Sequence, residues 1–358
     1  MKVRKLKLVN YKKFVVEKNI DFTNTENEVN YKTLLIGENG CGKTSVLQAI
    51  VFLVASLTKE KFTIEKMNWQ GFDLRLAQTG KMPLQIEAEI EFTDEEIENT
   101  GNSINQLINK GFELYTLRKV SNIATIFYDF QKQRVSVKNV KQLNLFKGYQ
   151  YAKMLTSYEN NTASLFDNIG NIYWYTDLRM ADNGLIFSLE TKDEDKVLPA
   201  LDRLRNYLAK AYYYHISKQQ VSSDKNDYFD LFEKFNELYS KVFPGRKFVG
   251  AVPRFDRFEE ENAPDFYLTD GRNQYELSEL SAGERAIFPI LMDFARRNIN
   301  NSIIIIDEIE LHLHPPLQQQ LIRVLSQLGK NNQFIFTSHS EPVFNMFKSS
   351  EIIRLENE

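Results

Sequence analysis

Eight consecutive residues near the start of the chain fit the phosphate-binding pattern GxxxxGK(S/T). They are Gly37, Glu38, Asn39, Gly40, Cys41, Gly42, Lys43 and Thr44, and Ser45 extends the same group of predicted phosphate contacts. Glycines let the backbone wrap closely around phosphates, the lysine places a positive charge near the β and γ groups, and the threonine hydroxyl can ligate magnesium. The pattern predicts a site for a nucleoside triphosphate with Mg²⁺.

Two carboxylates follow a run of four isoleucines much later in the chain. Ile303 to Ile306 lead directly into Asp307 and Glu308, and such an apolar run indicates a strand that is buried on both faces. Ligands bind at the carboxyl ends of such strands in open α/β sheets. We therefore expect Asp307 to hold Mg²⁺ and Glu308 to act as the general base that polarises the attacking water. The alternative is a solvated acidic turn after a core strand.

A third polar segment, Leu280 to Arg285, opens a predicted helix. Ser281 can cap this helix, Gly283 permits close backbone approach, and the exposed amides form an anion site. The alternative is an ordinary capped helix start.

The hydrophobic pattern of the rest of the chain predicts the strands and helices that position these three segments. Residues 86–92 alternate strictly between apolar and charged, which is typical of an antiparallel strand with one buried face. Helices and strands then alternate in the C-terminal part, which predicts a parallel, mostly covered sheet. The expected elements are a strand at 33–36, a helix at 44–55, a helix at 281–298, a strand at 302–306, a helix at 316–328 and a strand at 333–337.

Between these parts, apolar residues recur at helical spacing and predict an inserted helical lobe. The first series comprises Leu201, Leu204, Leu208 and Ala211, and the second comprises Phe232, Phe235, Tyr239 and Val242, before Pro244 and Gly245 end the helix. The aromatic residues are interpreted as a hydrophobic core face, with a docking stripe as the alternative.

The N-terminal segment alternates apolar and basic residues and predicts an exposed strand at a sheet edge or in a hairpin. Its basic residues could contact the phosphates of DNA, or could protect a solvated sheet edge. They are Lys2, Arg4, Lys5, Lys7, Lys12 and Lys13.

Bulk composition narrows the class of protein. The chain has 358 residues, of which 42% are hydrophobic, enough to fill the core of one large or two ordinary domains. The net charge of -3 argues against a uniformly basic coat, and the single cysteine, Cys41, excludes an intrachain disulfide. No apolar run reaches the roughly 18 residues that span a bilayer, and no signal sequence opens the chain, so a cytoplasmic location without a membrane partner is expected.

Taken together, these motifs resemble the ATP-binding-cassette ATPases of the SMC-like, RecF and OLD branch. The phosphate loop, the signature-like segment 280–285 and the Walker B carboxylates carry the resemblance. The run Glu310 to Pro315 and the sequence Thr337-Ser338-His339-Ser340 extend it. The signature carries Ala282 and Glu284 where transporters have glycine and glutamine.

The resemblance implies an α/β fold, an ABC-type head with a mixed sheet, an antiparallel β subdomain and an inserted helical lobe. Residues 1–93 would form the N-terminal half of the head, 94–245 the inserted β and helical region, and 246–358 the C-terminal half. ATP would lie between two copies of the head, so that hydrolysis needs a homodimer or a higher oligomer.

The resemblance also assigns roles to individual residues. Ser281, Gly283 and Glu284 of one copy would close over the γ-phosphate that the other copy holds, and His339 would be the switch histidine. Gln70 is the candidate Q-loop ligand of Mg²⁺, with Asn68 as its rival. His312 and His314 are placed on the dimer-facing D-loop rather than in a metal site. The segment 173–179 lies where relatives carry an aromatic residue and an arginine near the interface, although core packing explains its aromatic residues too.

Two functions follow from the resemblance. The first is an ATPase acting in DNA repair or anti-phage defence with a separately encoded nuclease or toxin, as in two-gene systems of the Septu type, with DNA as a candidate partner. The second is a regulatory scaffold that sequesters an effector through slow ATP turnover and does not itself bind DNA. The run 310–315 and the basic N-terminal strands argue against the ATPase subunit of a transporter.

Overall fold

The computed structural model describes residues 1–59, 83–117, 119–158, 163–176, 208, 231–252, 265–297 and 299–356. The chain divides into two compact units. Unit 1 comprises Met1–Trp174, Asn298–Ile309 and Leu328–Glu358, and unit 2 comprises Tyr175–Arg297 and Glu310–Gln327.

An antiparallel sheet in unit 1 has the strand order β2-β1-β4-β5-β6. Its strands are β1 (Lys2–Val9), β2 (Lys18–Asp21), β4 (Gln85–Glu91), β5 (Ile123–Asp129) and β6 (Arg134–Val137). In β4, Ile86, Ala88 and Ile90 are buried, so the predicted antiparallel strand with one buried face is confirmed. The first strand was predicted to lie exposed at a sheet edge or in a hairpin. The hairpin is confirmed, because β1 pairs antiparallel with β2, but the exposed edge is wrong, because β1 also pairs with β4 and is mostly buried.

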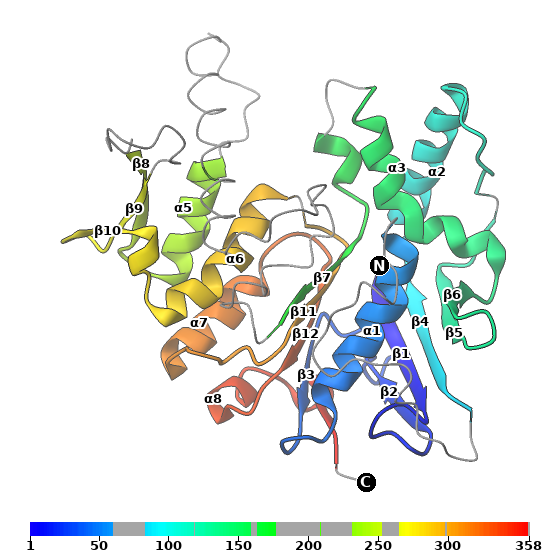
Figure 1. The fold of residues 1–358 in the computed structure, drawn as a ribbon, viewed down its shortest axis with the longest axis horizontal. Coiled ribbons are helices and arrows are strands. Elements are labelled where there is room, and N and C mark those ends of the chain that lie inside the picture. The colour runs from blue at the N-terminus through cyan, green and yellow to red at the C-terminus, as the bar shows by residue number, and fades with distance from the viewer. Residues whose placement is uncertain are drawn as a thin grey trace, which may run out of the picture. The chain divides into compact units, whose positions relative to one another are not determined.

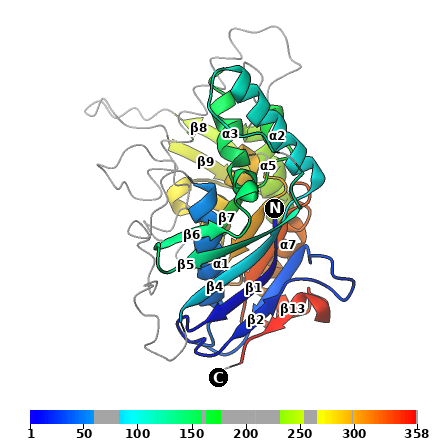
Figure 2. The ribbon, with the colours of Figure 1, turned by 90° about the vertical axis from the view of Figure 1, so that its right-hand side faces the viewer.

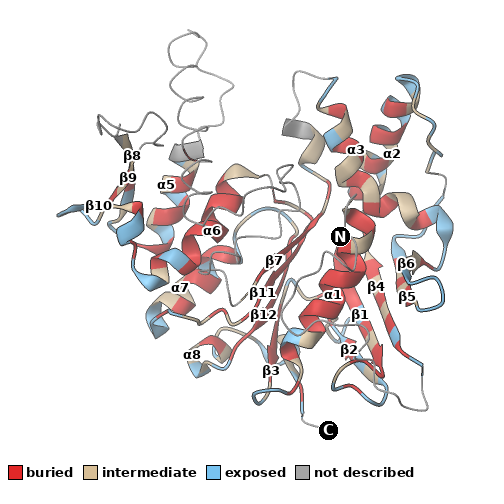
Figure 3. Cartoon of the chain, in the orientation of Figure 1, coloured by how far each residue is buried: buried red, intermediate tan, exposed pale blue. Residues whose placement is uncertain are grey.

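A second sheet in unit 1 has the order β13-β3-β12-β11-β7. Its strands are β13 (Ile352–Arg354), β3 (Lys32–Ile36), β12 (Gln333–Thr337), β11 (Ile303–Ile306) and β7 (Ile172–Tyr175). The pairs β13 with β3, β3 with β12, and β12 with β11 are parallel, as predicted. All four isoleucines of β11 are fully buried (Figure 3). Because the strands are parallel, β3, β11 and β12 end at the same edge.

Helix α1 (Lys43–Thr58) follows β3 and lies beside both sheets of unit 1 (Figures 1 and 2). It contacts β4, β5, β6 and α3 (Gly148–Leu155), which explains why it is buried around nearly its whole circumference. Helix α2 (Asp94–Asn109) begins with a capping box and packs on α3. Short elements complete the unit: η3 (Val140–Lys147), η4 (Ala163–Phe166), α8 (Glu341–Phe344) and η6 (Ser349–Glu351).

Unit 2 contains a three-stranded antiparallel sheet of order β10-β9-β8, three described α-helices and one short 3-10 helix. The elements are α5 (Leu231–Val242), β8 (Lys247–Val252), β9 (Asp265–Thr269), β10 (Gln274–Glu276), η5 (Leu277–Glu279), α6 (Ala282–Arg296) and α7 (Pro315–Leu325).

The aromatic residues of α5 form the core of unit 2. Phe235 and Tyr239 are both fully buried and stack on each other with 5.4 Å between ring centroids, and Phe235 also packs against Phe288 of α6. The interpretation of these residues as a core face is therefore confirmed. Leu208 is fully buried as well, whereas Leu201, Leu204, Ala211 and the side chain of Phe232 lie outside the described residues.

Candidate nucleotide-binding site

The phosphate loop connects β3 to α1 and has a backbone that only glycine accommodates at two positions. A Cβ atom on Gly37 would lie 2.3 Å from the carbonyl oxygen of Leu355 and 2.6 Å from the sulfur of Cys41. Gly42 has a φ of 102°, and a Cβ there would lie 2.8 Å from the ring of Phe14. The loop is therefore wrapped tightly by its neighbours, with Glu38, Asn39 and Gly40 exposed on its outer side.

Lys43 points back into this loop. Its Nζ donates hydrogen bonds to the carbonyl oxygens of Gly37 at 2.9 Å and Glu38 at 3.1 Å, and the side chain is buried. The ammonium group is thus already held at the centre of the loop by backbone oxygens. A triphosphate in the loop would meet a fixed positive charge, which is the role predicted for Lys43.

Asp307 lies beside the phosphate loop, although 263 residues separate it from Thr44 in sequence. Its Oδ2 accepts a hydrogen bond from the Thr44 hydroxyl at 2.9 Å, and its Oδ1 accepts one from the Thr337 hydroxyl. A hydroxyl oxygen and a carboxylate oxygen at this spacing are donors of the kind that Mg²⁺ prefers. The residues present therefore fit a magnesium ion.

Glu308 follows Asp307 with an unusual backbone conformation. Its φ is 46°, a left-handed value that is uncommon outside glycine. The N–H of Glu308 donates to the Thr337 hydroxyl at 2.7 Å, and the N–H of Ile309 donates to the Thr337 carbonyl at 3.1 Å. These two bonds hold the turn, so that Glu308 leaves the strand half-buried at the edge where the phosphate loop begins.

Thr337 was not assigned a role from sequence, yet it joins both acidic residues. The register of β11 and β12 pairs Ile306 with Phe336, which brings Thr337 opposite Asp307. A prediction that these two strands are neighbours would have been enough to find it. His339 follows two residues later and is exposed beyond the same sheet edge.

The turn after β1 also lies beside the phosphate loop, which was not predicted from the sequence. Tyr11 and Phe14 close this turn through two backbone hydrogen bonds, of 3.0 and 2.9 Å. The Nζ of Lys13 lies 3.4 Å from where a Cβ on Gly40 would be, and the Nζ of Lys12 donates to Gln48 in α1. Burial lowers the pKa of Lys12 to about 8. These two lysines therefore belong to the surroundings of the phosphate loop.

The other basic residues of the N-terminal strand are paired with acidic or polar groups. Arg4 bonds to Glu91, Lys7 forms an ion pair of 2.8 Å with Glu17, and Lys5 lies 3.9 Å from Asp21. Lys2 is buried and donates to Asn331. Charge pairing across β1, β2 and β4 thus explains these basic residues without DNA. This agrees with the alternative prediction, in which the residues serve the sheet and do not contact DNA.

The signature-like segment lies in unit 2 and opens α6. Ser281 is the N-cap and is exposed, and its hydroxyl accepts the N–H of Glu284 at 3.3 Å. A Cβ on Gly283 would lie 3.1 Å from the carbonyl oxygen of His312, so the helix start packs closely on the turn before α7. His312 and His314 are exposed on that turn. In the described ranges, no group of three or more His, Cys, Asp or Glu side chains could hold a metal ion.

Glu284 is placed differently from the expectation that its side chain closes over a γ-phosphate. The side chain is only 2% exposed, and its carboxylate accepts hydrogen bonds from the hydroxyls of Tyr239, Tyr275 and Ser281. Arg246 completes the set with an ion pair of 2.5 Å. The carboxylate is used inside unit 2, because a buried charge needs such partners.

Three further groups of residues were singled out from the sequence. Gln70 and its rival Asn68 lie outside the described residues, as do positions 177–179. Tyr173, Trp174 and Tyr175 are buried in β7, in agreement with core packing. Cys41 is buried in the phosphate loop, and Ser45 is half-buried at the start of α1.

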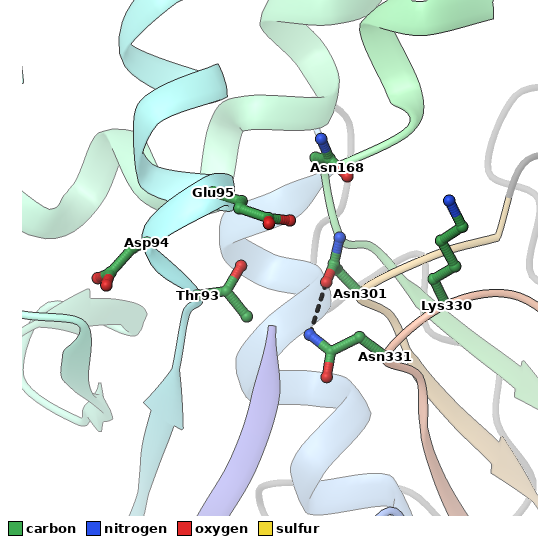
Figure 4. Close-up of a pocket in the computed structure, with 7 residues that line it drawn as sticks. All are labelled: Thr93, Asp94, Glu95, Asn168, Asn301, Lys330 and Asn331. Carbon is green, nitrogen blue, oxygen red and sulfur yellow. Dashed lines mark hydrogen bonds between the residues drawn. The ribbon is translucent and has the colours of Figure 1, made fainter.

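A pocket of about 420 Å³ lies elsewhere in unit 1 (Figure 4). Asn301 and Asn331 in its wall precede β11 and β12, and the amide of Asn331 donates to Asn301 at 2.7 Å. The pocket is therefore at the amino ends of strands whose carboxyl ends meet the phosphate loop. Thr93, Asp94, Glu95, Asn168 and Lys330 complete its lining. It is separate from the nucleotide site.

Known sequences that resemble this chain are described as ATPases. A family model described as "AAA ATPase domain" matches residues 1–343. "Retron Ec83 probable ATPase" of Escherichia coli is 27% identical over 399 residues, covering 100% of this chain and 72% of the relative. "Retron Vc95 probable ATPase" of Vibrio cholerae serotype O1 biovar El Tor is 24% identical, covering 100% and 74%. The prediction of an ATPase is confirmed.

Solved structures confirm the predicted fold. An SMC head bound to the C-terminal winged-helix domain of ScpA matches with a TM-score of 0.55 at 16% identity, covering 99% of this chain and 94% of that one. An SMC head domain with an extended coiled coil, bound to a ScpA domain from Pyrococcus furiosus, matches with a TM-score of 0.51 at 14% identity and the same coverage. The chain has the fold of an SMC-like, ABC-type head. Among the described helices, none has the length and apolar character to cross a bilayer.

Proposed function

Because the chain belongs to the AAA ATPase domain family, we propose that two copies of it close around ATP and separate again after hydrolysis. The phosphate loop of one copy would hold the phosphates, while Ser281 and Gly283 of the other would contact the γ-phosphate. The observation that carries the proposal is the bonding of Asp307 to both Thr44 and Thr337, which joins the phosphate loop to the acidic end of β11. The exposed start of α6 in unit 2 would supply a second anion-binding face.

Each group at the site has a proposed task. Lys43 would neutralise charge on the β and γ phosphates, and Thr44 with Asp307 would hold Mg²⁺, which supplies further neutralisation when bound. Glu308, oriented by the strained turn after β11, would accept the proton of the attacking water. His339, at the same sheet edge, would contact the γ-phosphate or orient that water.

Two substitutions test this mechanism. Glu308→Gln keeps the shape of the site and should bind ATP, abolish turnover and accumulate a dimer, whereas Lys43→Ala should lose nucleotide binding. Sedimentation with and without ATP measures the dimer, and phosphate release measures turnover. A Glu308→Gln protein that hydrolyses ATP at the wild-type rate would remove Glu308 from its role. A Glu308→Gln protein that stays monomeric with ATP bound would contradict the proposed dimer.

We infer a role in anti-phage defence, because two retron ATPases align with the whole length of this chain. A separately encoded effector, and DNA repair as the alternative role, are proposed from the family resemblance alone. Cells carrying the chain with its neighbouring genes should resist phage, and Glu308→Gln should abolish that resistance while the protein accumulates normally. Equal protection by the variant would show that hydrolysis is not needed for defence.

A second candidate function is a scaffold that holds an effector and does not bind DNA. The pairing of Arg4 with Glu91, of Lys7 with Glu17 and of Lys5 with Asp21 favours it, because these basic residues are already neutralised. ATPase rates with and without duplex DNA separate the two candidates. Strong stimulation that falls steeply with salt supports a DNA-driven machine, and indifference to DNA supports the scaffold.

A further inference from the structure

The two carboxylate oxygens of Glu284 face different partners. Oε1 accepts from the hydroxyl of Tyr239 at 2.5 Å and that of Tyr275 at 2.7 Å, and it pairs with Arg246 at 2.5 Å. Oε2 accepts from the backbone N–H of Ser281 at 3.0 Å and from its hydroxyl at 2.7 Å. One oxygen is thus anchored to the body of unit 2, and the other is bonded to the exposed N-cap of α6.

The carboxylate is ionised in this setting. Burial by itself would raise the pKa of Glu284, but the hydrogen bonds from Tyr239, Arg246, Ser281 and Tyr275 outweigh it and lower the pKa to about 2. A charged acceptor strengthens each of these bonds, so the group holds its neighbours more firmly than a neutral amide would. The start of α6 thus contains a fixed cluster around the Glu284 carboxylate, which we call the hub and which comprises Glu284, Tyr239, Tyr275, Arg246 and Ser281.

Ser281 has a single hydroxyl proton, and in this structure it is donated to Glu284. The serine oxygen is held independently by the N–H of Glu284, and the serine N–H is held by Glu284 Oε2. If the hydroxyl rotates its proton toward an incoming phosphate oxygen, these two backbone bonds keep the oxygen in place. The donor is therefore positioned before the phosphate arrives, which is what lowers the entropic cost of a transition-state contact.

We propose that Tyr239, Tyr275 and Arg246 are positioning residues for ATP turnover, acting through Glu284 on the hydroxyl of Ser281. This inference rests on the proposed closure of Ser281 over the γ-phosphate of a second copy. It replaces the expected contact between Glu284 and the nucleotide by an indirect role for that residue.

Tyr275 offers the cleanest test, because it is half-buried and Tyr275→Phe deletes one hydroxyl at the edge of the hub. Tyr267 on β9 is a matched control: it is also half-buried, and its hydroxyl makes no hydrogen bond within the described part of unit 2. Tyr239→Phe is less suitable, because that ring is fully buried in the aromatic core.

The experiment measures kcat, KM for ATP and the melting temperature for five proteins: wild type, Tyr275→Phe, Tyr267→Phe, Ser281→Ala and the Tyr275→Phe/Ser281→Ala double variant. We expect Tyr275→Phe to lower kcat roughly fivefold, the effect of about one hydrogen bond, with KM unchanged and the melting temperature lowered by about 2–4 °C. Tyr267→Phe should match the wild type. The double variant should be no slower than Ser281→Ala alone, because Tyr275 acts only through the serine.

Three results would contradict this expectation. An unchanged kcat for Tyr275→Phe, or the same fivefold loss with and without Ser281, overturns the positioning role and leaves the proposed closure standing. A Ser281→Ala protein with wild-type kcat overturns the closure itself, and the inference fails with it. Arg246→Gln provides a second variant, for which we expect a larger loss of kcat that again disappears in the Ser281→Ala background.

Discussion

The phosphate loop in unit 1 and the start of α6 in unit 2 are both polar turns that open a helix, yet they are built in opposite ways. The phosphate loop holds a positive charge, Lys43, on its own carbonyl oxygens, and its glycines at 37 and 42 have no room for a side chain. The start of α6 holds a negative charge, Glu284, on its own N-cap. We therefore expect the first turn to bind a triphosphate alone. The second turn already contains an internal anion and should contribute only when a second copy brings the phosphate to it.

The largest expected effect is on ATP affinity, which should depend on the phosphate loop and not on the start of α6. Lys43→Ala should weaken ATP binding by a factor of about 100 or more, because the positive charge at the centre of the loop is lost. Ser281→Ala should leave the affinity of the isolated chain unchanged and lower only turnover. Titration calorimetry in the Glu308→Gln background, in which ATP persists, measures both affinities at a protein concentration at which sedimentation shows monomers. Phosphate release from the variants that keep Glu308 measures turnover. Equal losses of ATP affinity in the two variants would contradict the different roles given to the two turns.

A second prediction concerns the glycines. Gly37→Ala should destabilise the fold by about 3 kcal/mol or more, because its Cβ would meet a backbone oxygen at 2.3 Å. Gly283→Ala should cost about 1 kcal/mol or less, since the 3.1 Å approach to His312 needs only a small shift and alanine favours the helix. Urea unfolding of both proteins tests the difference, and a tolerated Gly37→Ala would contradict the tight wrapping of the loop.

A third prediction sharpens the account of the acidic end of β11. Thr337→Val removes the hydroxyl shared by Asp307 and the N–H of Glu308, and should lower the free energy of unfolding by about 1–3 kcal/mol and kcat by roughly tenfold or more. Thr33→Val on the adjacent strand β3 is the control. Thr33 is also fully buried, but its hydroxyl has no hydrogen-bond partner in the described part of the chain. That variant should be neutral or slightly stabilising, and equal losses in the two would remove the special role of Thr337.

The sequence predicted the phosphate loop and the strands beside it well, because both rest on local signals. Four consecutive isoleucines before Asp307 could only be a buried strand, and the glycine spacing of 37–42 permits few other structures. The position of β1 was missed because alternation identifies a strand but not its neighbours. The acidic face of β4, with Glu89 opposite Lys5, was the available signal for that pairing.

The surroundings of Glu284 were less predictable. Ser281 and Glu284 have the spacing of a capping box, so one of its partners could have been read from the sequence. Tyr239 and Arg246 come from elements about 40 residues away, and no periodicity links them to α6. Likewise, Lys12 and Lys13 reach the phosphate loop only because the turn after β1 folds onto it. Charge patterning left DNA contact and a solvated sheet edge as the alternatives for these lysines, and neither includes this tertiary contact.

A fourth prediction uses Lys12 to test how charge is balanced around the phosphate loop. Burial lowers its pKa from 10.5 to about 8, so between these values the unfolded chain binds more protons than the folded one. The penalty for burying the charge is fully present below pH 8, and stability due to this group rises with pH from about 8 to 10.5. Lys12→Met should remove that rise, with Lys5→Met as the reference for loss of an exposed ammonium from β1. Bound ATP should move the rise to higher pH, because a nearby phosphate favours the charged lysine. If saturating ATP leaves the window in place, Lys12 serves the packing of α1 and not the nucleotide.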